Sequence, residues 1–92
     1  MKEVDIWIEV LSKLGWSFKD EESGPGNANK LIYWKESQYL YVYFNLKTSE
    51  VSSIIIKRTS YNQLDKPNIN KDIFYKMNID LFREVKLSYI TN

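Results

Sequence analysis

The segment YLYVYFNL at residues 39–46 constrains the fold more than any other stretch of the chain. A tyrosine and an apolar residue alternate along most of it, and successive side chains of a β-strand point to opposite faces of the sheet. One face would collect the apolar side chains and the other the phenol rings: Leu40, Val42, Phe44 and Leu46 against Tyr39, Tyr41 and Tyr43. The alternation therefore predicts a strand with a hydrocarbon core on one side and tyrosines on the other.

Two flanking segments have the branched and aromatic composition of strands, KLIYWK at 30–35 and VSSIIIKR at 51–58. The connections at 36–38 and 47–50 are short, and short connections join antiparallel neighbours. We therefore predict a three-stranded meander. Its first strand has large side chains on both faces, and a shift of one residue would exchange them. The sequence leaves open whether Tyr33 or Trp34 lies beside the tyrosines.

Apolar residues recur every three or four positions over 3–14, the period of a helix with one apolar stripe. Gly15 can adopt the left-handed conformation that ends such a helix, and Trp16 would then make the contact of a Schellman motif with Leu11. A second stripe predicts a helix over 79–90, which Asn78 can cap.

Residues 19–29 are rich in turn-forming residues, and we predict a loop there, with a solvated acidic run at 20–22. A long polar connection is expected over 59–71. The segment 72–77 fits a short edge strand or the start of a helix, and we favour the strand. The expected fold is one α+β domain over 1–92: a helix, a three- or four-stranded antiparallel meander and a second helix.

Composition excludes several function classes. The chain has no cysteine and no histidine, which removes disulfides, thiolate metal sites and the commonest general base and metal ligand. We find no catalytic motif and expect no enzyme activity, cofactor or metal. The longest apolar run falls far short of the roughly 20 residues that cross a bilayer, so we expect a cytoplasmic protein without a membrane partner. The net charge of +1 lacks the basic excess typical of nucleic-acid binders.

A tyrosine face of this size needs a cover. Half of three rings amounts to roughly 225–375 Å², close to the largest apolar patch of a typical monomer. Three covers are considered: a helix of the same chain, a protein partner (including a second copy), or stacked nucleotide bases. The candidate contact residues are all aromatic: Tyr39, Tyr41, Tyr43, Tyr33, Trp34 and, in the polar connection, Tyr61. The candidate anion contacts are cationic: Lys57, Arg58 and Lys35.

These observations favour a small non-enzymatic binding protein. Alanine occurs once and arginine twice, whereas lysine, asparagine, isoleucine and tyrosine are abundant, which suggests AT-rich coding DNA. Such an origin fits a phage or mobile-element protein that inhibits a host protein, for example a defence enzyme, through the aromatic face. The alternatives are a sponge or binding module for nucleotides or short nucleic acid, and a structural homodimer.

Overall fold

The structure is a computed structural model that describes residues 2–58 and 69–91. Within these residues the order of elements is α1 (Glu3–Lys13), β1 (Ser17–Ser23), β2 (Ala28–Lys35), β3 (Gln38–Asn45), β4 (Val51–Arg58), α2 (Lys71–Met77) and α3 (Ile79–Thr91). The strands form one antiparallel sheet in the order β1-β2-β3-β4. The predicted α+β fold is confirmed, as are the N-terminal helix and the C-terminal helix at 79–91. None of the helices in the described part of the chain is long and apolar enough to cross a lipid bilayer.

The predicted loop at 19–29 is wrong, because most of this segment belongs to a hairpin. β1 pairs with β2, and the chain turns between them where Gly24 N–H donates to the Ala28 carbonyl at 2.8 Å. All seven residues of β1 are exposed. The strand therefore lacks the apolar alternation by which strands are recognised. Its charged residues suit a sheet edge, where they discourage pairing with other chains.

The predicted strand at 72–77 is also wrong, because these residues form α2. The Asn70 side chain accepts a hydrogen bond from the Ile73 N–H at 2.9 Å and so caps the first turn. Phe74 is the buried residue of this helix. A short segment with one buried position shows no clear hydrophobic period. Its sequence therefore does not distinguish a strand from a helix. Most of the polar connection predicted over 59–71 cannot be compared, because residues 59–68 lie outside the described residues.

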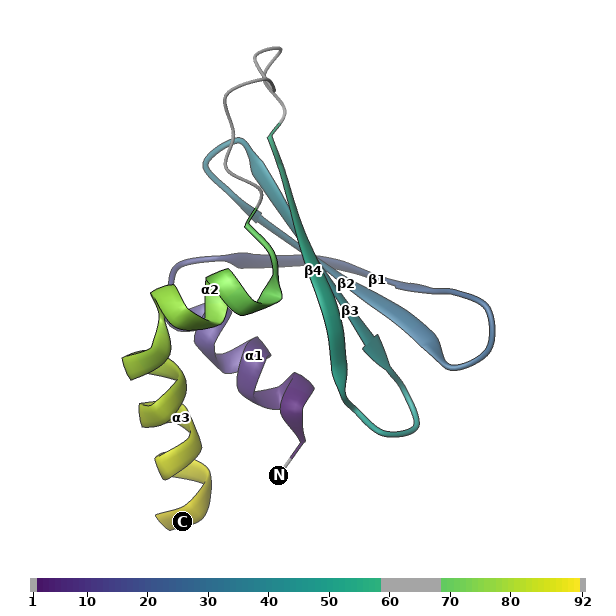
Figure 1. Cartoon of the computed structure of the whole chain (residues 1–92). Coiled ribbons are helices and arrows are strands. Elements are labelled where there is room, and N and C mark those ends of the chain that lie inside the picture. The colour runs from purple at the N-terminus through teal and green to yellow at the C-terminus, as the bar shows by residue number, and fades with distance from the viewer. Residues whose placement is uncertain (1, 59–68, 92) are drawn as a thin grey trace.

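α1 and α2 pack against the same face of the sheet, and α3 packs against α1 and α2 on that side (Figure 1). Leu40, Val42 and Phe44 point toward them, as the alternation predicts, and each is at most 8% exposed. Leu46 differs, because β3 ends at Asn45 and the leucine beyond it is exposed. The helices thus close one core on the Leu40 side of the sheet.

An aromatic cluster joins the helices to one another. The Trp7 ring of α1 lies 5.5 Å from the Phe74 ring of α2 and 4.7 Å from the Phe82 ring of α3, centroid to centroid. All three side chains are buried. Aromatic pairs at such distances add roughly 0.5–1.5 kcal/mol beyond the area they bury. Trp7 therefore holds both C-terminal helices against α1.

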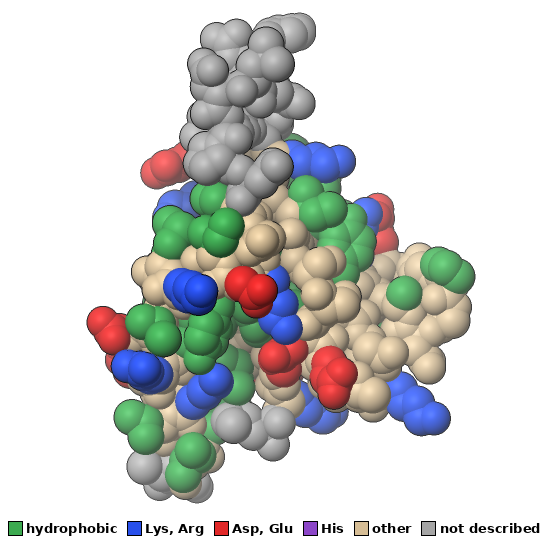
Figure 2. Space-filling view, viewed as in Figure 1, with side chains coloured by type: hydrophobic (Ala, Val, Ile, Leu, Met, Phe, Trp, Pro, Cys, Tyr) green, Lys and Arg blue, Asp and Glu red, His purple; other side chains and the backbone are tan. Residues whose placement is uncertain are grey.

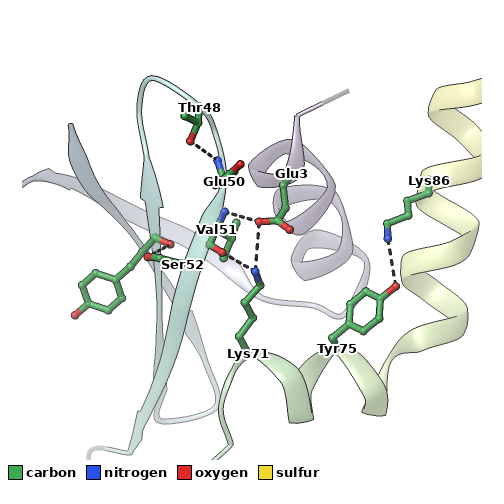
Figure 3. A network of polar contacts seen from close by, with 9 residues as sticks. Glu3, Thr48, Glu50, Val51, Ser52, Lys71, Tyr75 and Lys86 are labelled. Carbon is green, nitrogen blue, oxygen red and sulfur yellow. Dashed lines mark hydrogen bonds and ion pairs between the residues drawn. The ribbon is translucent and has the colours of Figure 1, made fainter.

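A polar clamp fixes the start of β4 between two helices (Figure 3). The Glu3 carboxylate of α1 accepts a hydrogen bond from the Val51 N–H. The Lys71 ammonium of α2 donates to the Val51 carbonyl at 2.6 Å and lies 3.4 Å from the Glu3 carboxylate. Both backbone groups of Val51 are thereby satisfied, and α1, α2 and the sheet are tied together at one residue.

The end of α1 has the predicted Schellman geometry. Trp16 N–H donates to the Leu11 carbonyl at 3.0 Å, and Gly15 N–H donates to the Ser12 carbonyl at 3.1 Å. Gly15 has a φ of +88°, and a Cβ placed there would meet nothing closer than the Lys35 Cε at 3.7 Å. Any cost of a side chain at this position is therefore one of backbone conformation.

Replacing Gly15 with alanine should lower the free energy of unfolding by about 1–2 kcal/mol, because an L-residue is strained at this φ. Urea denaturation followed by circular dichroism measures the loss. Gly24→Ala is the control, since Gly24 does not have a positive φ. An equal loss in both variants would contradict the conformational explanation.

Candidate binding surface

The sheet has a second face that points away from the helices, and we call it the open face. Three rows of paired residues cross it. They are Ser17–Trp34–Tyr39–Lys57, Asp20–Ile32–Tyr41–Ile55 and Glu22–Lys30–Tyr43–Ser53. The strand pairing therefore puts Trp34, and not Tyr33, beside the tyrosines.

The aromatic residues of the open face are accessible in part. Tyr39, Tyr41 and Tyr43 are half-buried. Trp34 is 37% exposed and Ile55 is 40% exposed. Of the three covers considered, a helix of the same chain is not the one formed by the described helices, whose buried side chains join the core on the other face. A protein or nucleotide cover remains a prediction.

Lysine side chains lie over the tyrosine rings. The Lys19 ammonium is 4.7 Å from the centroid of Tyr39, and that of Lys30 is 4.9 Å from the centroid of Tyr41. Lys57 approaches the Tyr41 ring as well, at 5.5 Å. These distances are typical of cation–π contacts, each worth roughly 0.5–1 kcal/mol at an exposed site.

The two ends of the open face differ in charge. At the Tyr43 end, Lys30 forms a salt bridge of 2.8 Å with Glu22. The hydrogen bond to Glu22 raises the pKa of Lys30 above its ordinary value, so the ammonium stays charged while its charge is balanced. At the Tyr39 end, Lys19 and Lys57 flank the aromatic pair of Trp34 and Tyr39. Positive charge is therefore concentrated at the Tyr39 end.

A bulge in β1 shapes the Tyr39 end. The pairing with β2 shifts between Phe18 and Asp20, which makes Lys19 the extra residue of the strand. The Lys19 ammonium donates to the Tyr39 hydroxyl at 3.0 Å. A shallow pocket of about 480 Å³ lies there, with walls formed by Ser17, Phe18, Lys19, Trp34 and Tyr39.

Several predicted site residues lie elsewhere. Tyr33 is only 3% exposed and points into the core, where burial raises the pKa of its phenol. It is therefore not available to a partner. Lys35 lies on the helical side too, and its ammonium donates to the Leu14 carbonyl at 2.6 Å beyond the end of α1. The backbone of Arg58 pairs with Gln38, but its side chain, like Tyr61, lies outside the described residues.

Sequence reasoning missed part of the open face. Lys19 and Asp20 were assigned to a loop, so neither was placed beside the aromatic residues. Ile32 and Ile55 belong there through the strand pairing. A charged segment that follows a helix and precedes a glycine-containing turn is the one signal that could have indicated a hairpin arm.

Apolar side chains are also exposed on the helical layer. They come from all three helices and include Ile8, Ile73, Met77, Leu87 and Ile90. Figure 2 shows hydrophobic side chains over this part of the molecule, at the left, with lysine, arginine and acidic side chains between them. Scattered exposure of this kind is ordinary for a protein surface. The open face is different, because four aromatic side chains lie next to one another on it, Trp34 beside Tyr39 and the three tyrosines along β3.

Comparisons of the chain with protein-family models, with curated proteins and with solved structures gave no match. The functional argument therefore depends on the physical character of the surface alone.

Proposed function

We propose that the chain is a non-enzymatic binding protein that contacts a protein partner through the open face. The observation that carries this proposal is the one-sided packing of the helices, which leaves Trp34 and three tyrosines in partly exposed rows. Tryptophan and tyrosine are the residues that most often dominate binding energy at protein interfaces. They combine a large apolar surface with a polar group that tolerates water when the partner is absent.

The mixed charge of the open face supports a protein partner. Lys19, Lys30 and Lys57 share it with Asp20 and Glu22. A surface with both signs of charge around an apolar centre resembles the polar rim and apolar core of protein interfaces. Complementary charges on the partner would set its orientation and speed its association.

Lys19 and Lys57 provide a cover that a partner can displace. Their contacts with the tyrosine rings are weak, roughly 0.5–1 kcal/mol each. Carboxylates on a partner offer the ammonium groups stronger hydrogen bonds. When the lysines move to such carboxylates, the rings become available for apolar contacts. One binding event thus satisfies both the charged and the aromatic groups.

The simplest version of this proposal is a homodimer in which two open faces meet about a twofold axis. The narrower hypothesis is that the partner is a host protein that a phage or mobile-element protein inhibits. Its support is the bias of the composition toward residues with AT-rich codons.

The test compares Tyr41→Ala with Tyr89→Ala, because Tyr89 is an exposed tyrosine of α3 on the helical layer. Loss of the Tyr41 ring should weaken the complex by about tenfold or more, as expected for an interface anchor. Sedimentation of the purified chain measures self-association, and affinity capture from cells of the native host measures binding of another protein. We expect Tyr89→Ala to bind as the original chain does. A complex that is unaffected by a folded Tyr41→Ala variant would overturn the proposal.

A further inference from the structure

The pocket at the Tyr39 end of the open face has the size of a small-molecule site. Its volume of about 480 Å³ lies within the roughly 300–1,000 Å³ typical of ligand pockets. Ser17, Lys19 and Tyr39 supply polar groups, and Trp34 and Tyr39 supply aromatic surface. A ligand for this pocket would therefore carry both a planar apolar group and hydrogen-bond acceptors.

The aromatic part of the pocket suits a planar ring. The Trp34 and Tyr39 rings lie 4.7 Å apart at an angle of 54°. The Trp34 side chain is 37% exposed. Nucleotide bases stack on such side chains with little dependence on base identity, because every base has a π-face.

Two lysines in and beside the pocket suit an anion: Lys19 lines the pocket, and Lys57 lies next to it on β4. Lys19 contacts the Tyr39 hydroxyl, and Lys57 is the cross-strand neighbour of Tyr39 with its ammonium over the Tyr41 ring. Neither lysine takes part in the salt bridges found within residues 2–58 and 69–91. The contacts shown for both are with neutral phenol groups, which bind an ammonium more weakly than phosphate oxygens do.

We propose that this pocket binds a nucleoside phosphate. The base would stack on Trp34 or Tyr39, and the phosphate oxygens would accept hydrogen bonds from Lys19 and Lys57. The proposal goes beyond the protein interface described above. It uses part of the same face but does not require a protein partner, so either proposal can fail without the other.

The rest of the open face limits the site to a single nucleotide. Asp20 lies in the row of Tyr41, and Glu22 lies in the row of Tyr43 and balances the charge of Lys30. A phosphodiester backbone running along β3 would pass these carboxylates and be repelled. A strand-binding platform would instead carry positive charge along its whole length.

The test is a titration of the purified chain with adenosine monophosphate, followed by the amide and indole NMR signals. We expect saturable shifts of Ser17, Lys19, Tyr39 and the Trp34 indole, with little change in α3. Adenosine and inorganic phosphate are titrated separately. The nucleotide should bind more tightly than either, because only the nucleotide uses both the rings and the lysines.

Variants assign the contacts. Trp34→Ala should weaken nucleotide binding about tenfold through lost stacking. Lys19→Ala and Lys57→Ala should each weaken it about fivefold, the upper range for an exposed charge pair. Lys76→Ala is the matched control, since this exposed lysine lies on α2 in the helical layer. The NMR spectrum of each variant shows whether it is folded.

Three results would overturn the proposal. The first is an absence of saturable shifts at millimolar nucleotide. The second is equal binding of inorganic phosphate and the nucleotide, which would indicate simple attraction of anions. The third is a short oligothymidylate that binds several orders of magnitude more tightly than thymidine monophosphate, which would indicate a strand-binding platform in place of a one-nucleotide pocket.

Discussion

Replacing Trp7 with alanine should lower the free energy of unfolding by about 3–5 kcal/mol, the usual cost of removing a large buried aromatic side chain. Trp7 is 2% exposed and contacts both Phe74 and Phe82. A chain of this length has a total stability of only about 5–14 kcal/mol. The substitution should therefore remove a large share of the stability, and nearly all of it if the total lies at the low end of this range. Urea denaturation followed by far-ultraviolet circular dichroism measures the change.

The other two tryptophans provide internal controls, because the same substitution can be made at three positions that differ in burial. Trp16 is half-buried against the core, and Trp34 is 37% exposed on the open face. Trp16→Ala should cost less than Trp7→Ala, and Trp34→Ala should cost the least, about 1 kcal/mol or below. An equal cost at Trp7 and Trp34 would contradict the placement of the core on the helical side alone.

The central part of the fold could be predicted because its pattern is strong. β3 alternates between two chemically distinct faces, and α1 has a stripe of period 3.6 that ends at a glycine. β1 gave no such signal, since none of its side chains is buried. β1 is held by backbone pairing with β2 and by polar side-chain contacts such as the Glu22–Lys30 salt bridge, and neither leaves a trace in a hydrophobic pattern.

Which residues lie on the open face depends on the strand register, because a shift of one residue exchanges the two faces. Residues 36–38 were expected to form the connection, but Lys35 pairs with Gln38, so the turn contains only Glu36 and Ser37. Both have positive φ, 47° and 62°. Turns of this kind favour Asn-Gly, and neither residue occurs at these two positions. Without that signal, Trp34 and Tyr33 could not be told apart as neighbours of the tyrosines.

Lys19 could not be assigned to the site from the sequence for a related reason. Lys19 lies on β1 and Tyr39 lies on β3, with β2 between them, and the Lys19 ammonium reaches the Tyr39 hydroxyl across the sheet. A strict alternation from Ser17 would have placed Lys19 on the open face only if β1 had been recognised as a strand. Lys19 and Lys57 thus come together at the Tyr39 end because strands that are distant in sequence lie in one sheet.

Adjacent residues of β3 should respond very differently to the same substitution. Leu40 is fully buried on the core face, and Leu40→Ala should cost about 2–5 kcal/mol through lost burial and the cavity left behind. Tyr41 is half-buried between Ile32 and Ile55 on the open face. Tyr41→Ala should cost only about 1 kcal/mol, the sum of weak cross-strand and cation–π contacts.

The difference between these two variants decides what the tyrosines do. If Tyr41→Ala is as destabilising as Leu40→Ala in urea denaturation, the tyrosine rings belong to a second core, and the open face is not a binding surface. If the Tyr41 variant keeps nearly full stability, the ring contributes little to folding. A large aromatic side chain that folding does not require, held in a row with Tyr39 and Tyr43 beneath displaceable lysines, is then best explained by contact with another molecule.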